Sequence, residues 1–328
     1  MPSVTEIQVL LKRNYPRLGT IRKIESIKHN DINSKNFVIH TNRRKFVLHY
    51  FTPDNFNAEK TEKICKILTF CVKHKARVPQ PIKTVTGKYV DKKERTYLTS
   101  FHIGATYGSS KEELNNFAKN LALIHKILKK SKIIYNYQNN PQSYRILTPH
   151  EFTKIQKIIT KKSTKNFYDN IILKYMNDLL KTALHDHKIS KEISKLGFKK
   201  QLIHNDLHPS NVIFYKKKVS AIVDFNFMRK GVIIEDIAFT SFRFALFSSS
   251  NVQKIQLHIK QFIKMYSLFN KINDEQLHYF DYYLKHILLG RISYILRKRY
   301  FHNSNLWINV LQDNLKLLKF AMKINPMK

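Results

Sequence analysis

The sequence predicts an α+β protein with two lobes: a small lobe over residues 1–101, built on an antiparallel sheet, and a larger, mostly helical lobe over residues 102–328. Two patterns support this prediction. Apolar residues alternate over 36–41 and 45–51 around a short polar turn, which is typical of a β-hairpin. From residue 112 onward, most apolar residues recur at helical spacing. A chain of 328 residues that is 43% hydrophobic is long enough to fill two cores.

The first lobe is expected to combine this hairpin with two helices and further short strands. In the longer helix Ile64, Leu68 and Cys71 recur on one face, which we expect to be buried. The expected elements are a short helix over 5–15, strands over 21–27, 36–41 and 45–51, a helix over 57–74, and strands near 88–90 and 95–100.

The second lobe is expected to be helical on both sides of one central stretch. His125 sits on an apolar helical face and is expected to be a packed histidine rather than a ligand. Gly197 is the expected stop of the last helix before the central stretch. The expected helices cover 112–130, about 150–162, 166–186 and 188–196, followed by a helical run from 239 to 327.

The central stretch, residues 202–227, has the pattern strand, loop, strand, turn and strand, and its polar residues are unusual for a core. Two carboxylates and one amide stand at the ends of apolar runs: Asp206, Asn211 and Asp224. A hairpin between the last two returns the chain to its starting point. Phosphoryl transfer from a nucleotide needs a base for the attacking hydroxyl and oxygen ligands for magnesium, and these side chains supply both.

The segment HNDLHPSN followed by IVDF resembles the aminoglycoside phosphotransferase, choline kinase and type II homoserine kinase family. Members of this family are small-molecule kinases with a protein-kinase-like fold. The resemblance implies that Asp206 is the general base, that His204 supports its loop, and that Asn211 and Asp224 bind Mg²⁺. Segment 231–238 also resembles the family, and there Asp236 is expected to brace the catalytic loop. The alternative is that these residues only cap a loop and end a strand.

The resemblance also implies a site for ATP in the first lobe. Ser34 closes a segment, 29–35, that stands where the family carries a phosphate-covering loop, although the usual glycines are missing. Glu62 corresponds to the helix glutamate that pairs with a strand cation, and a surface acid near the helix start is the alternative. Backbone groups from Ser100 to His102 correspond to the hinge that holds an adenine edge.

His49 stands where the family normally has a long cation that contacts the phosphates. Histidine has an ordinary pKa of about 6.5, so it is mostly neutral at pH 7 unless a partner raises that pKa. If Glu62 or the phosphates keep His49 protonated, it replaces the cation. If it stays neutral, Arg44 or Lys45 reaches in from the strand start, or the protein is a weak kinase or an inactive nucleotide-binding scaffold.

The chain carries 59 Lys and Arg against 23 Asp and Glu, a formal charge of +36. A nucleic-acid or anionic-membrane partner is one interpretation. The lysines are scattered without a basic stripe, however, so we expect a compositional bias and no specific nucleic-acid partner. The partner expected is a small hydroxyl acceptor. Polycationic aminoglycosides need an acidic pocket, and a chain with so few acids is poorly suited to them. An amino alcohol, an amino acid or a sugar is the alternative acceptor, and homoserine is favoured by analogy with the family.

Two cysteines, Cys65 and Cys71, form no disulfide framework or zinc spacing, which indicates a reducing, cytoplasmic location. The N-terminal residues lack the basic start and apolar stretch of a signal peptide. No apolar run approaches the roughly 20 residues of a membrane span.

Overall fold

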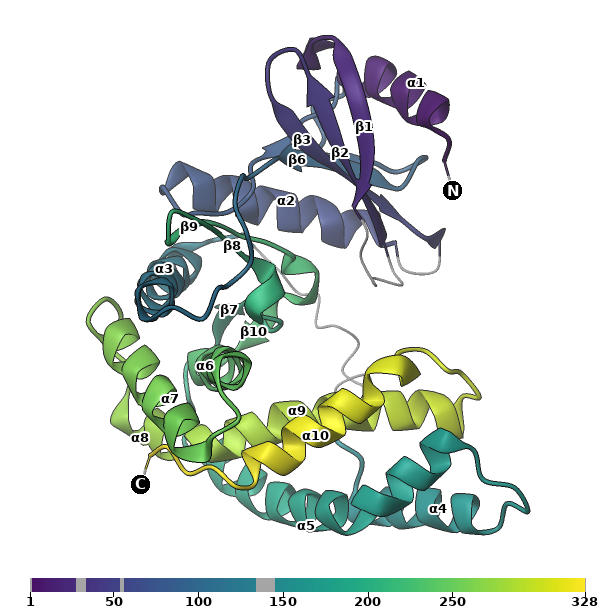
Figure 1. Cartoon of the computed structure of the whole chain (residues 1–328), viewed down its shortest axis with the longest axis vertical. Helices are drawn as coiled ribbons and strands as arrows, with labels where there is room; N and C mark the ends of the chain where they lie inside the picture. Colours follow the sequence, from purple (N-terminus) through teal and green to yellow (C-terminus); the bar gives the residue numbers. More distant parts are fainter. Residues whose placement is uncertain (1, 28–33, 54–55, 134–144, 328) are drawn as a thin grey trace. The chain divides into compact units, whose positions relative to one another are not determined.

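The computed structural model describes residues 2–27, 34–53, 56–133 and 145–327 (Figure 1). The chain packs as two compact units. The first contains residues 1–135 and 209–228, and the second contains residues 136–208 and 229–328. Part of the central stretch therefore packs with the sheet of the first unit. The sequence-based lobe boundary after residue 101 stays a prediction.

The first unit is built on an antiparallel sheet with the order β1-β2-β3-β6-β4, in which β5 also pairs with β6. Residue pairs such as Leu48 and Leu98 fix the register of β3 against β6. The expected hairpin and the antiparallel sheet are confirmed. The strands are β1 (Ile21–Ile27), β2 (Ser34–Thr41), β3 (Lys45–Phe51), β4 (Pro81–Ile82), β5 (Val90–Asp91) and β6 (Thr96–Ser100).

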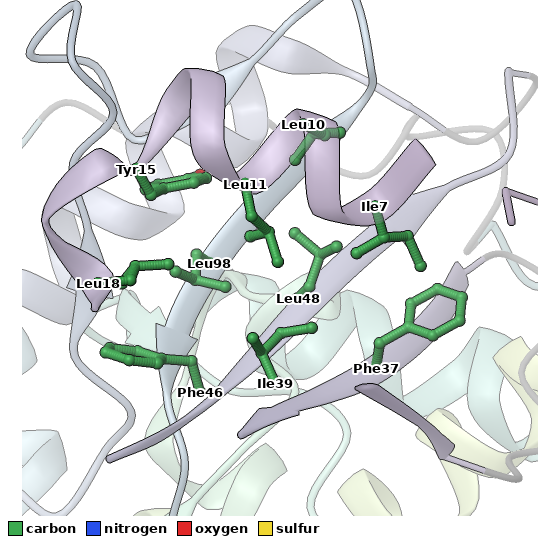
Figure 2. Packing of buried hydrophobic residues seen from close by; sticks show 10 residues of the cluster. All are labelled: Ile7, Leu10, Leu11, Tyr15, Leu18, Phe37, Ile39, Phe46, Leu48 and Leu98. Atoms are coloured by element: carbon green, nitrogen blue, oxygen red, sulfur yellow. The ribbon is translucent and has the colours of Figure 1, made fainter. Parts of the chain in front are cut away.

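Helix α1 (Val4–Asn14) covers one face of this sheet, as Figure 2 shows. Its Ile7 and Leu11 pack against Leu48 and Ile39, and all four side chains are almost completely buried. A capping box between Ser3 and Glu6 starts the helix. Because side chains alternate along a strand, the neighbours of Leu48 point to the opposite face. Helix α2 (Ala58–Lys73) supplies the buried Cys65 to a second cluster there.

The first unit also holds helix α3 (Lys111–Lys130) and the hairpin formed by β8 (Val212–Tyr215) and β9 (Lys218–Ile222). The segment after β6 is fixed to this hairpin by two bonds: the N–H of Ala105 donates to the carbonyl of Phe214 at 2.9 Å, and the reverse bond is 2.7 Å. Gly104 has φ +146°, and a Cβ atom there would lie 2.2 Å from the Phe214 carbonyl oxygen. Only glycine fits this close approach.

The second unit is helical around a two-stranded pairing of β7 (Gln201–Ile203) with β10 (Arg229–Gly231). The predicted break between helices 166–186 and 188–196 is wrong, because α5 runs unbroken from Phe167 to Lys195. Gly197 follows with φ +59°, which confirms the predicted stop. The other helices are α4 (Pro149–Thr160), α6 (Ile233–Ser248), α7 (Val252–Ser267), α8 (Asp274–His278), α9 (Phe280–Phe301) and α10 (Leu311–Ala321).

Several smaller expectations are confirmed. His125 is fully buried on α3. Cys65 and Cys71 are buried free thiols. Within the described residues, no helix is both long enough and apolar enough to cross a bilayer.

Candidate active site

The loop that carries Asp206 follows β7 and is held by one buried carboxylate from α6. Asp236 accepts hydrogen bonds from the backbone N–H groups of His204 at 2.6 Å and Asn205 at 2.7 Å. Asn205 has φ +66°, a left-handed conformation that asparagine tolerates better than most residues. His204, Asn205 and Asp236 are all buried. The structure thus confirms that Asp236 braces this loop.

The carboxylate of Asp206 is held by an arginine that the sequence did not single out. Arg291 of α9 donates through Nη2 to Asp206 Oδ1 at 2.6 Å and to the carbonyl of Asn205 at 3.1 Å. On the other side, His208 Nε2 lies 4.0 Å from Asp206 Oδ2. Burial lowers the pKa of His208 to about 4 against the opposing effect of Asp206, so this imidazole is neutral near pH 7.

A second arginine, Arg243 of α6, interacts electrostatically with both Asp206 and Arg291. Burial is the main cause that lowers the pKa of Arg243 to about 10, and Arg291 lowers it further, whereas Asp206 and Asp313 act in the opposite direction. Both guanidinium groups lie over the ring of Phe239, at 5.6 Å for Arg243 and 4.4 Å for Arg291. In a chain with 59 basic residues, no sequence signal distinguished these two.

The hairpin in the first unit brings the two predicted metal ligands to one end. Asn211 stands directly before β8, and Asp224 follows β9 by two residues. Because Val212 pairs with Ile222 and the N–H of Val223 donates to the Asn211 carbonyl at 2.9 Å, Asn211 and Asp224 flank the same end of the ladder. Asp224 has φ +63°, and its carboxylate accepts the N–H of Asn226 at 3.4 Å.

A lysine of α2 acts on the same aspartate. Lys60 is half-buried in the first turn of α2, and this helix packs against the short turn η4 (Phe225–Phe227) that follows Asp224. Burial lowers the pKa of Lys60, and the charge of Asp224 partly offsets this effect. Lys60 lies two residues before Glu62, which corresponds to the family's helix glutamate.

His49 of β3 packs within the sheet of the first unit. Its ring stacks on Tyr97 with centroids 4.2 Å apart, and Nε2 lies 3.1 Å from the hydroxyl of Thr99. Burial lowers the pKa of His49 to about 3, so the ring is neutral near pH 7. A neutral ring corresponds to the second of the two outcomes that the sequence left open, and the role of His49 stays a prediction.

The expected partners of His49 are also engaged elsewhere. Glu62 accepts the backbone N–H groups of Tyr89 at 3.0 Å and Val90 at 3.1 Å, and no ion pair joins it to His49 in the described part of the chain. These bonds tie α2 to the segment that enters β5. The two cations considered as substitutes lie over aromatic rings of the sheet: Arg44 over Phe46, and Lys45 over Phe101.

The predicted adenine-binding residues lie at the end of β6. The hydroxyl of Ser100 accepts the N–H of Gln80 at 2.9 Å and lies 3.2 Å from His102 Nε2. Burial is the main cause that lowers the pKa of His102. Ser34 is the first residue of β2, and the predicted phosphate-covering loop before it falls on residues 28–33, outside the described residues.

A family model described as a phosphotransferase enzyme family matches residues 23–256. The chain belongs to this family. The matched segment contains Asp206, Asn211, Asp224 and Asp236, so the phosphotransferase class predicted from the central stretch is confirmed. No curated protein matches the chain.

Solved structures of the phosphotransferase family share the fold of this chain. Amicoumacin kinase in complex with AMP-PNP and Ca²⁺ matches with a TM-score of 0.66 at 12% identity, covering 99% of this chain and 95% of that one. An aminoglycoside phosphotransferase from Alicyclobacillus acidocaldarius matches with a TM-score of 0.65 at 14% identity, covering 93% and 89%. Choline kinase from Streptococcus pneumoniae matches with a TM-score of 0.58 at 14% identity, covering 96% and 98%. The predicted protein-kinase-like α+β fold is confirmed.

The lowered pKa of His49 predicts a dependence of folding stability on pH. Between pH about 3 and about 6.5 the unfolded chain binds a proton at this position that the folded chain does not. The stabilisation is therefore complete above pH 6.5 and is lost as the pH falls, with a slope of at most about 1.4 kcal/mol per pH unit. We expect His49→Gln to reduce this slope in urea unfolding between pH 4 and 7.

His185→Gln, at an exposed position on α5, serves as the control and should keep the wild-type slope. An equally steep slope in His49→Gln and the wild type would contradict the assignment of a half-buried, neutral His49.

Proposed function

We propose that this phosphotransferase transfers the γ-phosphoryl group of ATP, with Mg²⁺, to a hydroxyl group of a small molecule. The observation that carries the proposal is the β8–β9 hairpin, which places Asn211 and Asp224 at the same end of its ladder. Asn211 follows Asp206 by five residues, and Asp236 braces the loop that carries Asp206. Phosphoryl transfer depends mainly on positioning and charge stabilisation, and this stretch supplies rigid oxygen donors and a base.

The donor set at the hairpin fits magnesium. Mg²⁺ prefers hard oxygen ligands and usually takes one or two protein groups together with phosphate oxygens and water. An amide oxygen from Asn211 and a carboxylate from Asp224 match this preference. Within the described residues, no three His, Cys, Asp or Glu side chains gather into a site built from protein ligands alone, so the phosphates are expected to complete the coordination. When bound, Mg²⁺ neutralises charge on the phosphate oxygens.

Lys60 is proposed to supply the positive charge that His49 lacks. It lies on α2 beside the segment of Asp224, and its charge interacts with that of this predicted metal ligand. A half-buried ammonium there would contact phosphate oxygens in place of a strand lysine. Two structures similar to this chain were solved with AMP-PNP or with ADP, which supports a nucleotide as the phosphoryl donor.

The adenine edge is proposed to meet backbone groups after Phe101. The N–H of Ser100 donates to the carbonyl of Gln80 and the N–H of Phe101 donates to the carbonyl of Lys45, so both N–H groups are already bonded within the protein. The hydroxyl of Ser100 is bonded to Gln80 and lies near His102, and its part in binding adenine stays a prediction. Recognition is assigned to His102 and the residues that lead to Gly104.

Asp206 is proposed as the general base. It accepts the proton of the acceptor hydroxyl while the acceptor oxygen bonds to the γ-phosphorus and the bond from that phosphorus to the leaving ADP breaks. Arg291 fixes Oδ1 of Asp206, which orients the carboxylate. His204 stays a structural residue, because its backbone N–H anchors the loop to Asp236.

Asp206→Asn should lower turnover by at least about 10²-fold, the usual scale for a positioned base. Binding of Mg·ATP should change little, because Asn211, Asp224 and Lys60 belong to the other unit. The measurement is ADP release with an identified acceptor, with Mg·ATP affinity measured by calorimetry in parallel. Turnover close to that of the wild type would remove Asp206 from the role of base.

Lys60→Met should weaken binding of Mg·ATP by about 10-fold, the value of roughly 1.4 kcal/mol expected for one charged contact. Lys66→Met removes the same charge from an exposed position of the same helix and serves as the control. Calorimetry at constant ionic strength separates the two. Equal affinities for Lys60→Met and Lys66→Met would show that Lys60 contributes only to the general positive charge.

A second candidate function is a nucleotide-binding scaffold of the same fold with weak or no activity. The neutral His49 is the observation that favours it, since the strand lacks the usual phosphate-binding cation. Mg·ATP binding without phosphorylation of any acceptor in a broad hydroxyl panel would support the scaffold. Product formation with one acceptor would exclude it.

A further inference from the structure

Two arginines from different helices meet beside the proposed base. Arg243 comes from the middle of α6 and Arg291 from α9, and both lie over the ring of Phe239. Two like charges that share one aromatic ring repel each other, and partial burial strengthens that repulsion. One carboxylate, Asp206, contacts this pair directly, through Arg291. A second negative group would offset the remaining repulsion.

Arg243 is the less compensated charge of the pair. Arg291 is already bonded to Asp206 and to the carbonyl of Asn205. Arg243 forms no ion pair with any carboxylate among the residues that the structure describes, although it is half-buried. Asp206 and Asp313 both act on Arg243, but Asp206 is bonded to Arg291, and Asp313 is exposed on α10, where solvent screens its charge. Burying a cation without a close counter-ion is costly, so such a site favours an anionic ligand.

The remaining groups around Asp206 do not cancel this charge. Burial lowers the pKa of His208 to about 4, so the imidazole adds neither a positive nor a negative charge near pH 7. The carboxylate of Asp236 is occupied by the two backbone N–H groups of the loop. A polycationic acceptor such as an aminoglycoside would therefore meet two guanidinium groups beside the base.

We propose that the acceptor carries an anionic group, a carboxylate or a phosphate, in addition to its reacting hydroxyl, and that Arg243 with Arg291 binds this group. The proposal rests on the proposed phosphotransferase function and names its substrate class. Planar guanidinium groups bind both carboxylates and phosphates in a bidentate manner, so they are the side chains suited to this task. Held there, the anion would place a hydroxyl of the same molecule near Asp206.

The test compares hydroxyl compounds that carry an anionic group with related hydroxyl compounds that lack one. The carboxylate arm uses L-homoserine and 4-hydroxybutyrate against 1,4-butanediol and 4-amino-1-butanol. The phosphate arm uses ribose 5-phosphate against ribose, and kanamycin represents the polycations. Acceptor-dependent ADP release is measured at saturating Mg·ATP, and binding of each compound is measured separately by calorimetry. We expect one of the anions to exceed its neutral counterpart by about 10- to 100-fold in kcat/KM, as for a charged hydrogen bond.

Variants assign the preference to the arginine. Arg243→Gln should remove most of the advantage of the anionic acceptor, mainly through a higher KM, so that the anionic acceptor and its neutral counterpart react with similar kcat/KM. Arg243→Lys keeps the charge without the bidentate geometry, so it should keep part of the advantage of the anionic acceptor. Lys264→Gln, at an exposed position on α7, removes one charge elsewhere and should leave the preference intact.

Three results would overturn the proposal. The neutral or cationic compounds react as well as the anions, Arg243→Gln slows all acceptors equally, or none of the anions binds the wild type in calorimetry. A failure of the proposed phosphotransferase function is recognised separately, because it removes Mg·ATP binding or ADP release with every acceptor. Binding of the anions to the wild type, and its loss in Arg243→Gln, does not depend on that reaction.

Discussion

The site depends on the buried carboxylate of Asp236. It receives two backbone N–H groups of the loop after β7, and one of them belongs to Asn205, which adopts a left-handed conformation. Such a backbone persists only where its surroundings hold it. The two charge-assisted bonds fix the direction in which the chain leaves β7, and so they fix the backbone position of Asp206. An apolar residue at position 236 would leave two buried donors unpaired.

The basic side chains near the predicted site residues are of two kinds, neutral and charged. The histidines at positions 49 and 208 are kept neutral by their surroundings. The permanent charges come from Lys60 in one unit and from Arg243 and Arg291 in the other. A strongly basic chain therefore uses a few cations whose long side chains reach inward, while most of its charge remains a general property of the surface.

Short-range patterns made much of this structure predictable. Alternating apolar residues specified β3, and helical spacing specified α2 and α3 within one residue at most ends. The spacing of Asp206, Asn211 and Asp224 encodes a strand, a loop and a hairpin, which is local information. The continuity of α5 was missed, although no proline or glycine lies between Phe167 and Lys195 to break that helix.

What the sequence could not reveal depends on distant contacts. Arg243 and Arg291 lie 48 positions apart and meet only because α6 packs on α9. Lys60 looked like one more surface lysine of α2 until the fold placed its helix against the segment after Asp224. The identity of His49 was plain, but its protonation depends on burial, and burial is a tertiary property.

The central claim is that Asp224 and Asn211 hold the metal that binds the nucleotide phosphates. The most direct measurement is calorimetric titration of ATP into the wild type and Asp224→Ala, each with and without Mg²⁺. The account predicts that Mg²⁺ strengthens ATP binding to the wild type and that this increase disappears in Asp224→Ala, while the variant keeps a cooperative unfolding transition. An unchanged dependence on Mg²⁺ in Asp224→Ala would contradict the account.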